Sequence, residues 1–370
     1  MYTAQQLLAI ASHFAIDGDL VQVKQLGEGF INDTFTVYTK GNSPSYVLQR
    51  KNKHIFTNVP AMMNNIVSVT NHLREKVVAV HGNPQHEVLT VIAATDGHPY
   101  YQDEAGEYWV MTLYIDGAVT HNRADSTELA YKGGLAIGRF QSQLADFAQD
   151  LYEVIPGFHN LGHRLQQWDE ALARDRAGRR DLVAREIDWI ESRREAMMRF
   201  QQLVDNGTLP KRVTHNDTKI SNILFDQAGN VMCVIDLDTV MSSTSLNDYG
   251  DAIRSYANTG SEDDRDLDRV SLSLPMCEAY TRGYLLQRRS TLTDAELQNL
   301  AMSARFITYE QVLRFLMDYI DGDTYYKTAY PDHNLVRARA QYALLQSMES
   351  HYDDMRHFVD CYSRNSTLPL

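Results

Sequence analysis

The spacing of the apolar residues changes near Asp116-Gly117, and this change restricts the fold classes open to the chain. Before that point the sequence predicts five short strands, at Leu20–Leu26, Thr34–Tyr38, Tyr46–Arg50, Val88–Ala93 and Tyr108–Leu113. A helix at about Ala4–Phe14 precedes them, and a helical stretch, Val59–Val80, interrupts them. After that point long helical periods dominate, beginning with Glu128–Phe147 and Asp181–Val204.

A strand-rich part followed by a helix-rich part predicts the α+β class. We expect two lobes: a small antiparallel sheet in residues 1–113 and a mostly helical lobe in residues 114–370. A chain of 370 residues is long enough to bury a core in each. Ligands tend to bind in clefts between such lobes.

Charge and cysteine content exclude several classes of protein. With 35 basic and 48 acidic residues the net charge is −13, so the basic face of a nucleic-acid-binding protein is not expected. The three cysteines lack the spacing of a disulfide framework or a zinc site, which is typical of a reducing compartment. The N-terminal residues do not resemble a signal peptide and no apolar run is long enough to cross a membrane. We therefore expect a cytoplasmic protein, monomeric or a weak homodimer, with no membrane partner.

The stretch from Val213 to Asp238 places many acidic and amide side chains around two short apolar runs. Asp217 and Asn222 have the H-x-D-x4-N layout, and Asp236 ends the following apolar strand. In kinase-type phosphoryl transfer, such an Asp accepts the hydroxyl proton of the acceptor, while the Asn and the second Asp hold Mg²⁺ against the phosphates of ATP. The spacing therefore predicts Asp217 as the catalytic residue and Asn222 and Asp236 as metal ligands. Ordinary turn and cap chemistry is the simpler alternative, and Asp238 could bind a second metal or only support the loop.

Two segments of the first lobe are candidates for holding ATP. Gly27, Gly29 and Asn32 lie in a turn between two predicted strands, where glycines permit close approach of the backbone to phosphates. The backbone of the predicted strand at Met111 and Leu113 is in the position from which kinases bind adenine.

The lysine that kinases carry on the third strand is missing from its usual place. Arg50 stands there and is the candidate phosphate-binding cation, with Lys51 and Lys53 as alternatives. Later in the chain, Asp248 or Asp251 is expected to orient the catalytic loop, although either could equally be a helix cap.

Several stretches of the sequence resemble the N-acetylhexosamine 1-kinases, within the aminoglycoside-phosphotransferase and choline-kinase-like superfamily. The stretches are LGEGFINDTFTV, YVLQRKNKHIFTNVPAMMNNI, HNDTKISNILFD and RFLMDYIDGDTYY. The resemblance to the wider superfamily rests on HNDTKISNILFD and VIDLDTV. The resemblance implies a bilobal protein-kinase-like fold and an ATP- and Mg²⁺-dependent enzyme that phosphorylates the anomeric hydroxyl of N-acetylglucosamine or N-acetylgalactosamine. It also implies that Arg314 and Tyr325 contact the acetamido sugar. From its spacing alone, the segment Glu310-x3-Arg314-x3-Asp318 reads as an i,i+4 salt-bridge ladder.

Other functions remain open at this point. Within the same class they are kinases of choline, homoserine, methylthioribose or aminoglycosides. Outside it they are a metal-dependent phosphoesterase and a nucleotide-binding pseudokinase regulator, the latter suggested by the missing strand lysine. The choice between the two N-acetylhexosamines depends on the orientation of one hydroxyl, which spacing does not predict.

Overall fold

The computed structural model describes residues 2–27 and 31–364, and the chain divides into two compact units. The first, here called the sheet unit, consists of Met1–Thr120, Asp146–Ile155 and Ile223–Ser242. The second, the helical unit, consists of His121–Ala145, Pro156–Asn222 and Ser243–Leu370. The boundary expected at residues 113/114 lies close to the end of the first segment. The two later segments of the sheet unit come from the stretch that the sequence assigns to the helical lobe.

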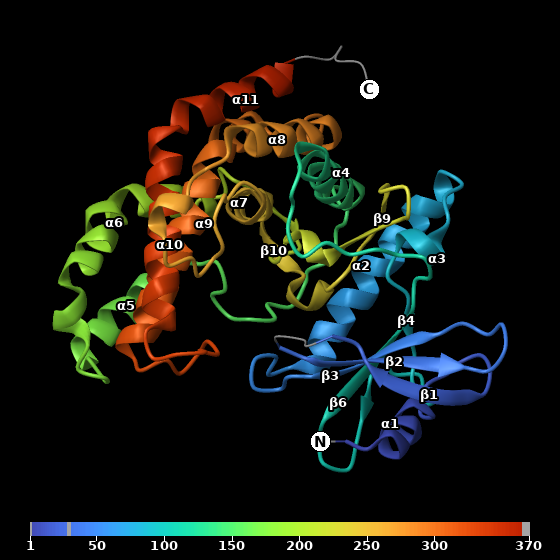
Figure 1. The fold of residues 1–370 in the computed structure, drawn as a ribbon. Coiled ribbons are helices and arrows are strands. Elements are labelled where there is room, and N and C mark those ends of the chain that lie inside the picture. The colour runs from blue at the N-terminus through green and yellow to red at the C-terminus, as the bar shows by residue number, and fades with distance from the viewer. Residues whose placement is uncertain (1, 28–30, 365–370) are drawn as a thin grey trace. The chain divides into compact units, whose positions relative to one another are not determined.

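The sheet unit is built on an antiparallel sheet in the order β1-β2-β3-β6-β4, with β5 paired to β6 (Figure 1). Its strands are β1 (Leu20–Gln25), β2 (Asp33–Thr39), β3 (Tyr46–Lys51), β4 (Val91–Ile92), β5 (Tyr101–Gln102) and β6 (Tyr108–Leu113). The five predicted strands are all present, so this prediction is confirmed, and β5 is additional. A separate hairpin of β8 (Ile223–Phe225) and β9 (Val231–Val234) turns at Asp226, whose Oδ1 accepts from the N–H groups of Ala228 and Asn230.

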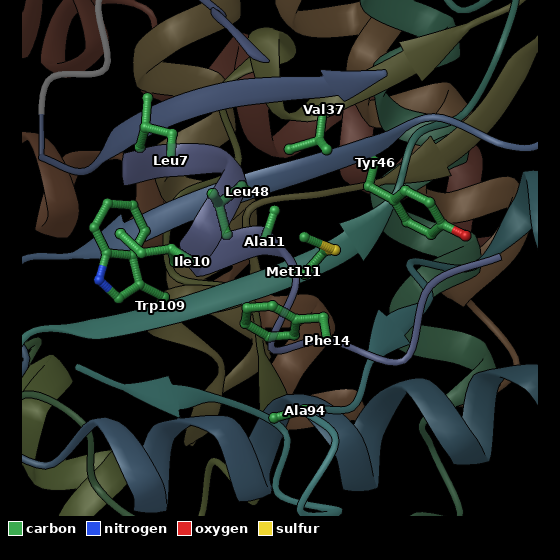
Figure 2. Close-up of a cluster of buried hydrophobic side chains, with 10 residues drawn as sticks. All are labelled: Leu7, Ile10, Ala11, Phe14, Val37, Tyr46, Leu48, Ala94, Trp109 and Met111. Atoms are coloured by element: carbon green, nitrogen blue, oxygen red, sulfur yellow. The ribbon is translucent and has the colours of Figure 1, made fainter. Parts of the chain in front are cut away.

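One face of this sheet is covered by α1 (Ala4–Ala11), which begins with a capping box between Thr3 and Gln6. The buried side chains of this core come from α1, from the three central strands and from the adjoining loops (Figure 2): Leu7, Ile10, Ala11, Phe14, Val37, Tyr46, Leu48, Ala94, Trp109 and Met111. Side chains alternate between the two faces of a strand. Since Tyr46 and Leu48 of β3 face α1, Arg50 lies on the same side and Lys51 on the other.

Helix α2 (Val59–Ala79) holds the end of the β8–β9 segment through one buried amide. Asn65 Nδ2 donates to the carbonyl oxygens of Tyr152 (2.8 Å) and Val240 (3.0 Å). Its Oδ1 accepts from the N–H of Tyr152 at 2.9 Å. The amide of Asn65 therefore hydrogen-bonds to the backbone of two segments that are distant in sequence but belong to the same unit. Helix α3 (Pro84–Glu87) follows.

The helical unit contains most of the remaining elements. Its helices are α4 (Thr127–Gln143), α5 (Leu161–Arg174), α6 (Ala184–Asp205), α7 (Ser245–Tyr256), α8 (Leu274–Arg288), α9 (Asp294–Ile320), α10 (His333–Ser350) and α11 (Tyr352–Arg364). Short 3-10 turns lie at Arg180–Val183, Ile220–Asn222 and Leu267–Arg269, β7 covers Lys211–Thr214, and β10 (Met241–Thr244) crosses the boundary between the units.

Helices α4 and α8 approach so closely that their contact needs glycine. A Cβ on Gly134 would overlap the backbone of Tyr280 and Tyr284, and one on Gly283 would overlap the carbonyl of Tyr131. Helix α9 is buried along most of its length and packs beside α10 (Figure 1). No helix in the described part of the chain is long and apolar enough to cross a membrane.

The Arg-rich stretch Arg174–Arg194 is interrupted by a turn and is not one continuous helix. Helix α5 ends at Arg174, and the chain turns through Asp175 and Gly178, which have φ values of 40° and 65°. A backbone in this left-handed region cannot continue an α-helix. Helix α6 then starts at Ala184.

Candidate active site

In the sheet unit, a buried ion pair joins β3 to the residues that follow β9. Lys51 Nζ lies 2.7 and 2.8 Å from the two carboxylate oxygens of Asp238, and the two side chains are 2% and 8% exposed. Lys51 also donates to Gln49 Oε1 at 2.7 Å. Asn32 Nδ2 donates to Asp238 Oδ2 at 2.7 Å, so Asp238 connects the end of the glycine-containing turn to β3. These contacts agree with the supporting role suggested for Asp238.

Arg50 lies on the face of β3 opposite to Lys51. Its guanidinium pairs with Asp33 at 2.6 Å and approaches Glu107 to 3.5 Å, with 34% of the side chain exposed. Of the three cations considered from the sequence, Lys51 is therefore the one on the side of Asp238. The sequence contained a signal for this choice. Tyr46 and Leu48 are apolar and share one face of the strand with Arg50, so Lys51 had to lie on the opposite face.

The other predicted nucleotide-binding residues lie in the sheet unit as well. Gly27 has a left-handed φ of 66°, and Gly29 falls outside the described residues. The side chain of Met111 is in the α1 core, and the N–H of Leu113 donates to the carbonyl of Thr90 at 2.9 Å. A ligand at Leu113 would therefore have to use its carbonyl group or the residues beyond it. Asp236 precedes the 3-10 turn Leu237–Thr239 with a φ of 61°.

In the helical unit, the segment His215–Asn222, here called the catalytic loop, is held by two buried carboxylates of α7, those of Asp248 and Asp251. Asp248 accepts from the N–H of His215 at 2.9 Å and of Asn216 at 2.7 Å. Gln141 Nε2 also donates to Asp248 at 2.7 Å. Burial raises the pKa of Asp248, and the charge of His215 and these donors oppose the rise. The role suggested for Asp248 as an orienting residue fits this geometry.

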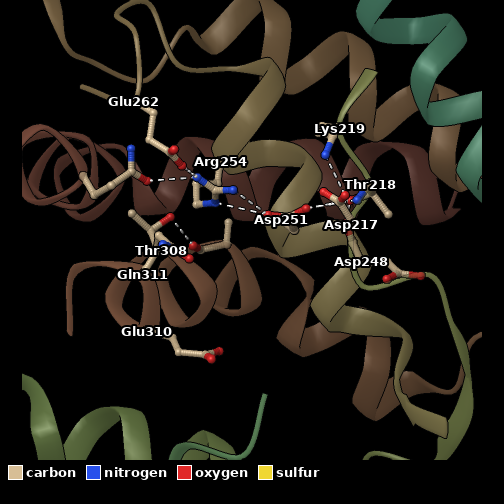
Figure 3. A network of polar contacts seen from close by, with 12 residues as sticks. Asp217, Thr218, Lys219, Asp248, Asp251, Arg254, Glu262, Thr308, Glu310 and Gln311 are labelled. Atoms are coloured by element: carbon tan, nitrogen blue, oxygen red, sulfur yellow. Dashed lines mark hydrogen bonds and ion pairs between the residues drawn. The ribbon is translucent and has the colours of Figure 1, made fainter. Parts of the chain in front are cut away.

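The second carboxylate, that of Asp251, holds Thr218, on the other side of Asp217. Asp251 Oδ2 accepts from the N–H of Thr218 at 3.0 Å, while its Oδ1 binds Arg254 at 2.8 Å. Arg254 also binds Glu262 at 2.8 Å, and Figure 3 shows it between the two carboxylates. Burial tends to raise the pKa of Asp251, but the charge of Arg254 outweighs it and the pKa is lowered. Asp251 is therefore held as a carboxylate, which is the form that accepts from Thr218.

Asp217 is partly exposed and is surrounded by donors from its own loop. Its Oδ2 accepts from Lys219 Nζ at 2.7 Å and from Asn222 Nδ2 at 3.0 Å. Its N–H donates to His215 Nδ1 at 3.2 Å, so His215 supports the loop from inside. The carboxylate is thus oriented by two side chains and keeps 34% of its side-chain surface exposed, as a group that meets a substrate must.

Of the two residues predicted as metal ligands, Asn222 belongs to the helical unit and Asp236 to the sheet unit. Asn222 uses its amide nitrogen for both hydrogen bonds to Asp217, so these bonds leave its amide oxygen unused. The described residues contain no group of three or more His, Cys, Asp or Glu that could hold a metal by itself. Mg²⁺ usually takes one or two protein ligands and completes its shell with phosphate and water.

A polar and aromatic group of side chains, here called the acceptor cluster, gathers beside α9 in the helical unit. It comprises Phe158, His159, Arg164, Glu310, Arg314, Tyr325 and Tyr326. The i,i+4 ladder suggested by the spacing is not formed. Glu310 pairs instead with His159 at 2.8 Å and lies 3.7 Å from Arg164, and its pKa is lowered because His159, Arg314 and Arg164 outweigh the effect of burial.

Arg314 and Tyr325, the two residues predicted to bind the substrate, lie close together, with Tyr326 beside them. The guanidinium carbon of Arg314 is 5.4 Å from the ring centre of Phe158, 5.8 Å from that of Tyr325 and 5.6 Å from that of Tyr326. Phe158 and Arg164 come from a loop and from α5, and no motif in the sequence marks either of them.

Asp318 holds the loop that carries these tyrosines. Its Oδ1 accepts from the N–H groups of Thr324 and Tyr325, both at 2.8 Å. Its Oδ2 accepts from the N–H of Tyr326 at 2.9 Å and from Asn334 at 2.8 Å. Asp318 therefore binds the backbone of this loop, and its carboxylate is not paired with Arg314.

The chain has the protein-kinase-like fold, with an antiparallel sheet in its N-terminal region and a mostly helical C-terminal part. The chain is similar to an aminoglycoside phosphotransferase from Alicyclobacillus acidocaldarius subsp. acidocaldarius DSM 446, with a TM-score of 0.58, 13% sequence identity and coverage of 98% of this chain and 97% of that chain. It is also similar to a microcompartment-associated aminopropanol kinase, with a TM-score of 0.56, 16% identity and coverage of 94% and 97%. Residues 22–285 match the phosphotransferase enzyme family, and the chain belongs to this family.

Proposed function

We propose that the protein transfers the γ-phosphoryl group of ATP to the anomeric hydroxyl of an N-acetylhexosamine, giving the sugar 1-phosphate. Membership of the phosphotransferase enzyme family supports the reaction class. The resemblance of four separate stretches to the N-acetylhexosamine 1-kinases supports the acceptor. The pseudokinase and phosphoesterase alternatives are less consistent with a loop in which Asp217 is oriented by Lys219 and Asn222.

The observation that carries the choice of acceptor is the charge of the acceptor cluster. Arg164 and Arg314 supply two positive charges and Glu310 one negative charge, so the three together have an excess of one positive charge. Burial, together with the like charge of Arg314, lowers the pKa of Arg164. An ammonium group is repelled by such a site. Choline, aminoglycosides and other amines are therefore poorer acceptors here than a neutral sugar.

In the proposed reaction, Asp217 aligns the attacking hydroxyl and accepts its proton as the new O–P bond forms. Lys219 Nζ, 2.7 Å from Asp217 Oδ2, holds that carboxylate in place before transfer. Asp248 and Asp251 hold the backbone on both sides of Asp217, which limits the loss of entropy when the hydroxyl is positioned. Lys51 is the cation best placed in the sheet unit to serve the phosphates.

Asn222 and Asp236 would hold Mg²⁺. When bound, this ion neutralises charge on the phosphate oxygens of ATP.

The test is a coupled assay of ADP release with N-acetylglucosamine, N-acetylgalactosamine, choline, ethanolamine, homoserine, methylthioribose and kanamycin as acceptors. We expect the two N-acetylhexosamines to give the highest kcat/KM and ³¹P NMR to show an anomeric phosphate. The Asp217→Asn variant should bind ATP normally and lose at least about 100-fold in kcat, the range expected for a general base. A higher kcat/KM for choline or kanamycin than for either sugar would refute the proposed acceptor. Near-normal turnover by the variant would refute the role of Asp217.

A further inference from the structure

The innermost pair of the acceptor cluster has buried polar atoms that its neighbours do not use. His159 and Glu310 have side chains that are 8% and 1% exposed, and they are joined through His159 Nδ1 and Glu310 Oε2. Among the described residues, neither His159 Nε2 nor Glu310 Oε1 has a hydrogen-bond partner. A buried polar atom without a partner is costly, and such atoms in native proteins call for an explanation.

The surroundings of these atoms restrict what could bind them. Arg164 Nε lies 3.7 Å from Glu310 Oε1, which is too far for a hydrogen bond. Arg164 gives its hydrogen bonds instead to the carbonyl of Phe158, at 2.9 and 3.2 Å, and to Gln167. Glu310 is therefore compensated in charge, and its buried Oε1 has no donor within hydrogen-bond distance among the described residues.

Glu310 and Arg314 stand four residues apart on α9, so their side chains share one face of the helix. One is an acceptor and the other a donor. A molecule that meets both must offer a hydrogen-bond donor and, beside it, an acceptor. Hydroxyl and amide groups of a neutral sugar satisfy this requirement. A carboxylate would be repelled by Glu310, and an ammonium group by Arg314 and Arg164.

Resting on the kinase activity proposed above, we propose that His159 and Glu310 form a recognition point for the acceptor, at which Glu310 Oε1 accepts a hydrogen bond from an N–H or O–H of a neutral ligand. Glu310 thereby disfavours an anionic group at this one point, while the guanidinium groups give the cluster as a whole its excess of positive charge and disfavour cationic ligands. His159 Nε2 supplies a second polar contact on the same side.

The experiment measures binding by calorimetry on the full chain, in parallel with turnover. Glu310→Gln keeps the shape of the side chain but removes its charge and replaces one acceptor oxygen by a donor NH₂ group. We expect its affinity for N-acetylglucosamine to fall about 10- to 100-fold, the range for a lost hydrogen bond to a charged group. Its affinity for glucuronic acid should rise relative to wild type, and ATP binding should be unchanged. Glu195→Gln, which makes the same change on a side chain that is 91% exposed, is the matched control.

A second variant guards against a purely structural effect. His159→Asn can still donate to Glu310 from its amide nitrogen but has no atom at the position of Nε2. We expect weaker binding of N-acetylglucosamine, unchanged ATP binding and a melting temperature close to that of wild type.

The outcomes separate this inference from the proposed function. If the sugar binds wild type and Glu310→Gln equally well, the inference is refuted and the proposed function stands. If the sugar binds wild type more tightly than Glu310→Gln but is not phosphorylated, the proposed function is refuted and the recognition point stands. If the wild-type chain binds no sugar, both are refuted.

Discussion

Replacing Lys51 by methionine should destabilise the sheet unit much more than the same replacement of Arg50. Lys51 is 2% exposed and makes two hydrogen bonds to Asp238 and one to Gln49. Its removal leaves the carboxylate of Asp238, 8% exposed, with Asn32 as the hydrogen-bond partner that the structure records. Breaking one side of a buried ion pair costs about 3–5 kcal/mol, because the remaining charge is buried without compensation.

Arg50 provides the matched control on the next residue of the same strand. Its side chain is 34% exposed and its partner Asp33 is 51% exposed, so solvent screens the pair. Exposed ion pairs contribute about 0–1 kcal/mol. The two methionine variants should therefore differ by at least about 2 kcal/mol in the free energy of unfolding.

The assay is urea unfolding followed by circular dichroism, with hydrogen exchange measured in peptides from β3 and from β8–β9 to locate the loss. The double variant Lys51→Met with Asp238→Asn should recover part of the stability, because no uncompensated charge is then buried. A difference below about 1 kcal/mol between the single variants would refute the reasoning. So would a double variant that is no more stable than Lys51→Met.

Two further predictions concern the helical unit. In thermal unfolding, Gly134→Ala should lower the free energy of unfolding by about 1–3 kcal/mol, because its Cβ would overlap the backbone of α8. The control is Gly162→Ala, whose Cβ meets one side-chain oxygen at 3.3 Å and which should be neutral or slightly stabilising. Glu296 is held by Arg212 at 2.8 Å; burial tends to raise the pKa of Glu296, but the hydrogen bond from Arg212 outweighs it and the pKa is lowered. Its stabilising effect is then complete above the unfolded pKa near 4.3 and is lost as the pH falls through the lower folded value, so urea unfolding should show a steeper loss of stability below about pH 4.5 in wild type than in Glu296→Gln. Equal costs for the two glycine variants, or equal pH slopes for the two proteins, would contradict these assignments.

Much of the fold followed from local patterns in the sequence. The alternation of apolar residues predicted the strands of the sheet, and the helical periods predicted α2, α4 and α6, because such periodicities reflect which side of an element is buried. Turn chemistry at Asp226 was also predictable, since its side chain bonds to its own backbone neighbours. Composition does not locate the turn at Asp175 and Gly178, which divides the Arg-rich stretch between two helices.

By itself, the sequence predicted the class of the protein and the H-x-D-x4-N spacing of Asp217 and Asn222, since both depend on residue order along the chain. Only the tertiary structure decided how the charges are paired. Lys51 rather than Arg50 faces Asp238 because α1 covers the other side of β3, and Glu310 binds His159 rather than Arg314 because a distant loop packs against α9. Spacing predicts which side chains could meet on one element, whereas partners from distant segments depend on how the elements pack.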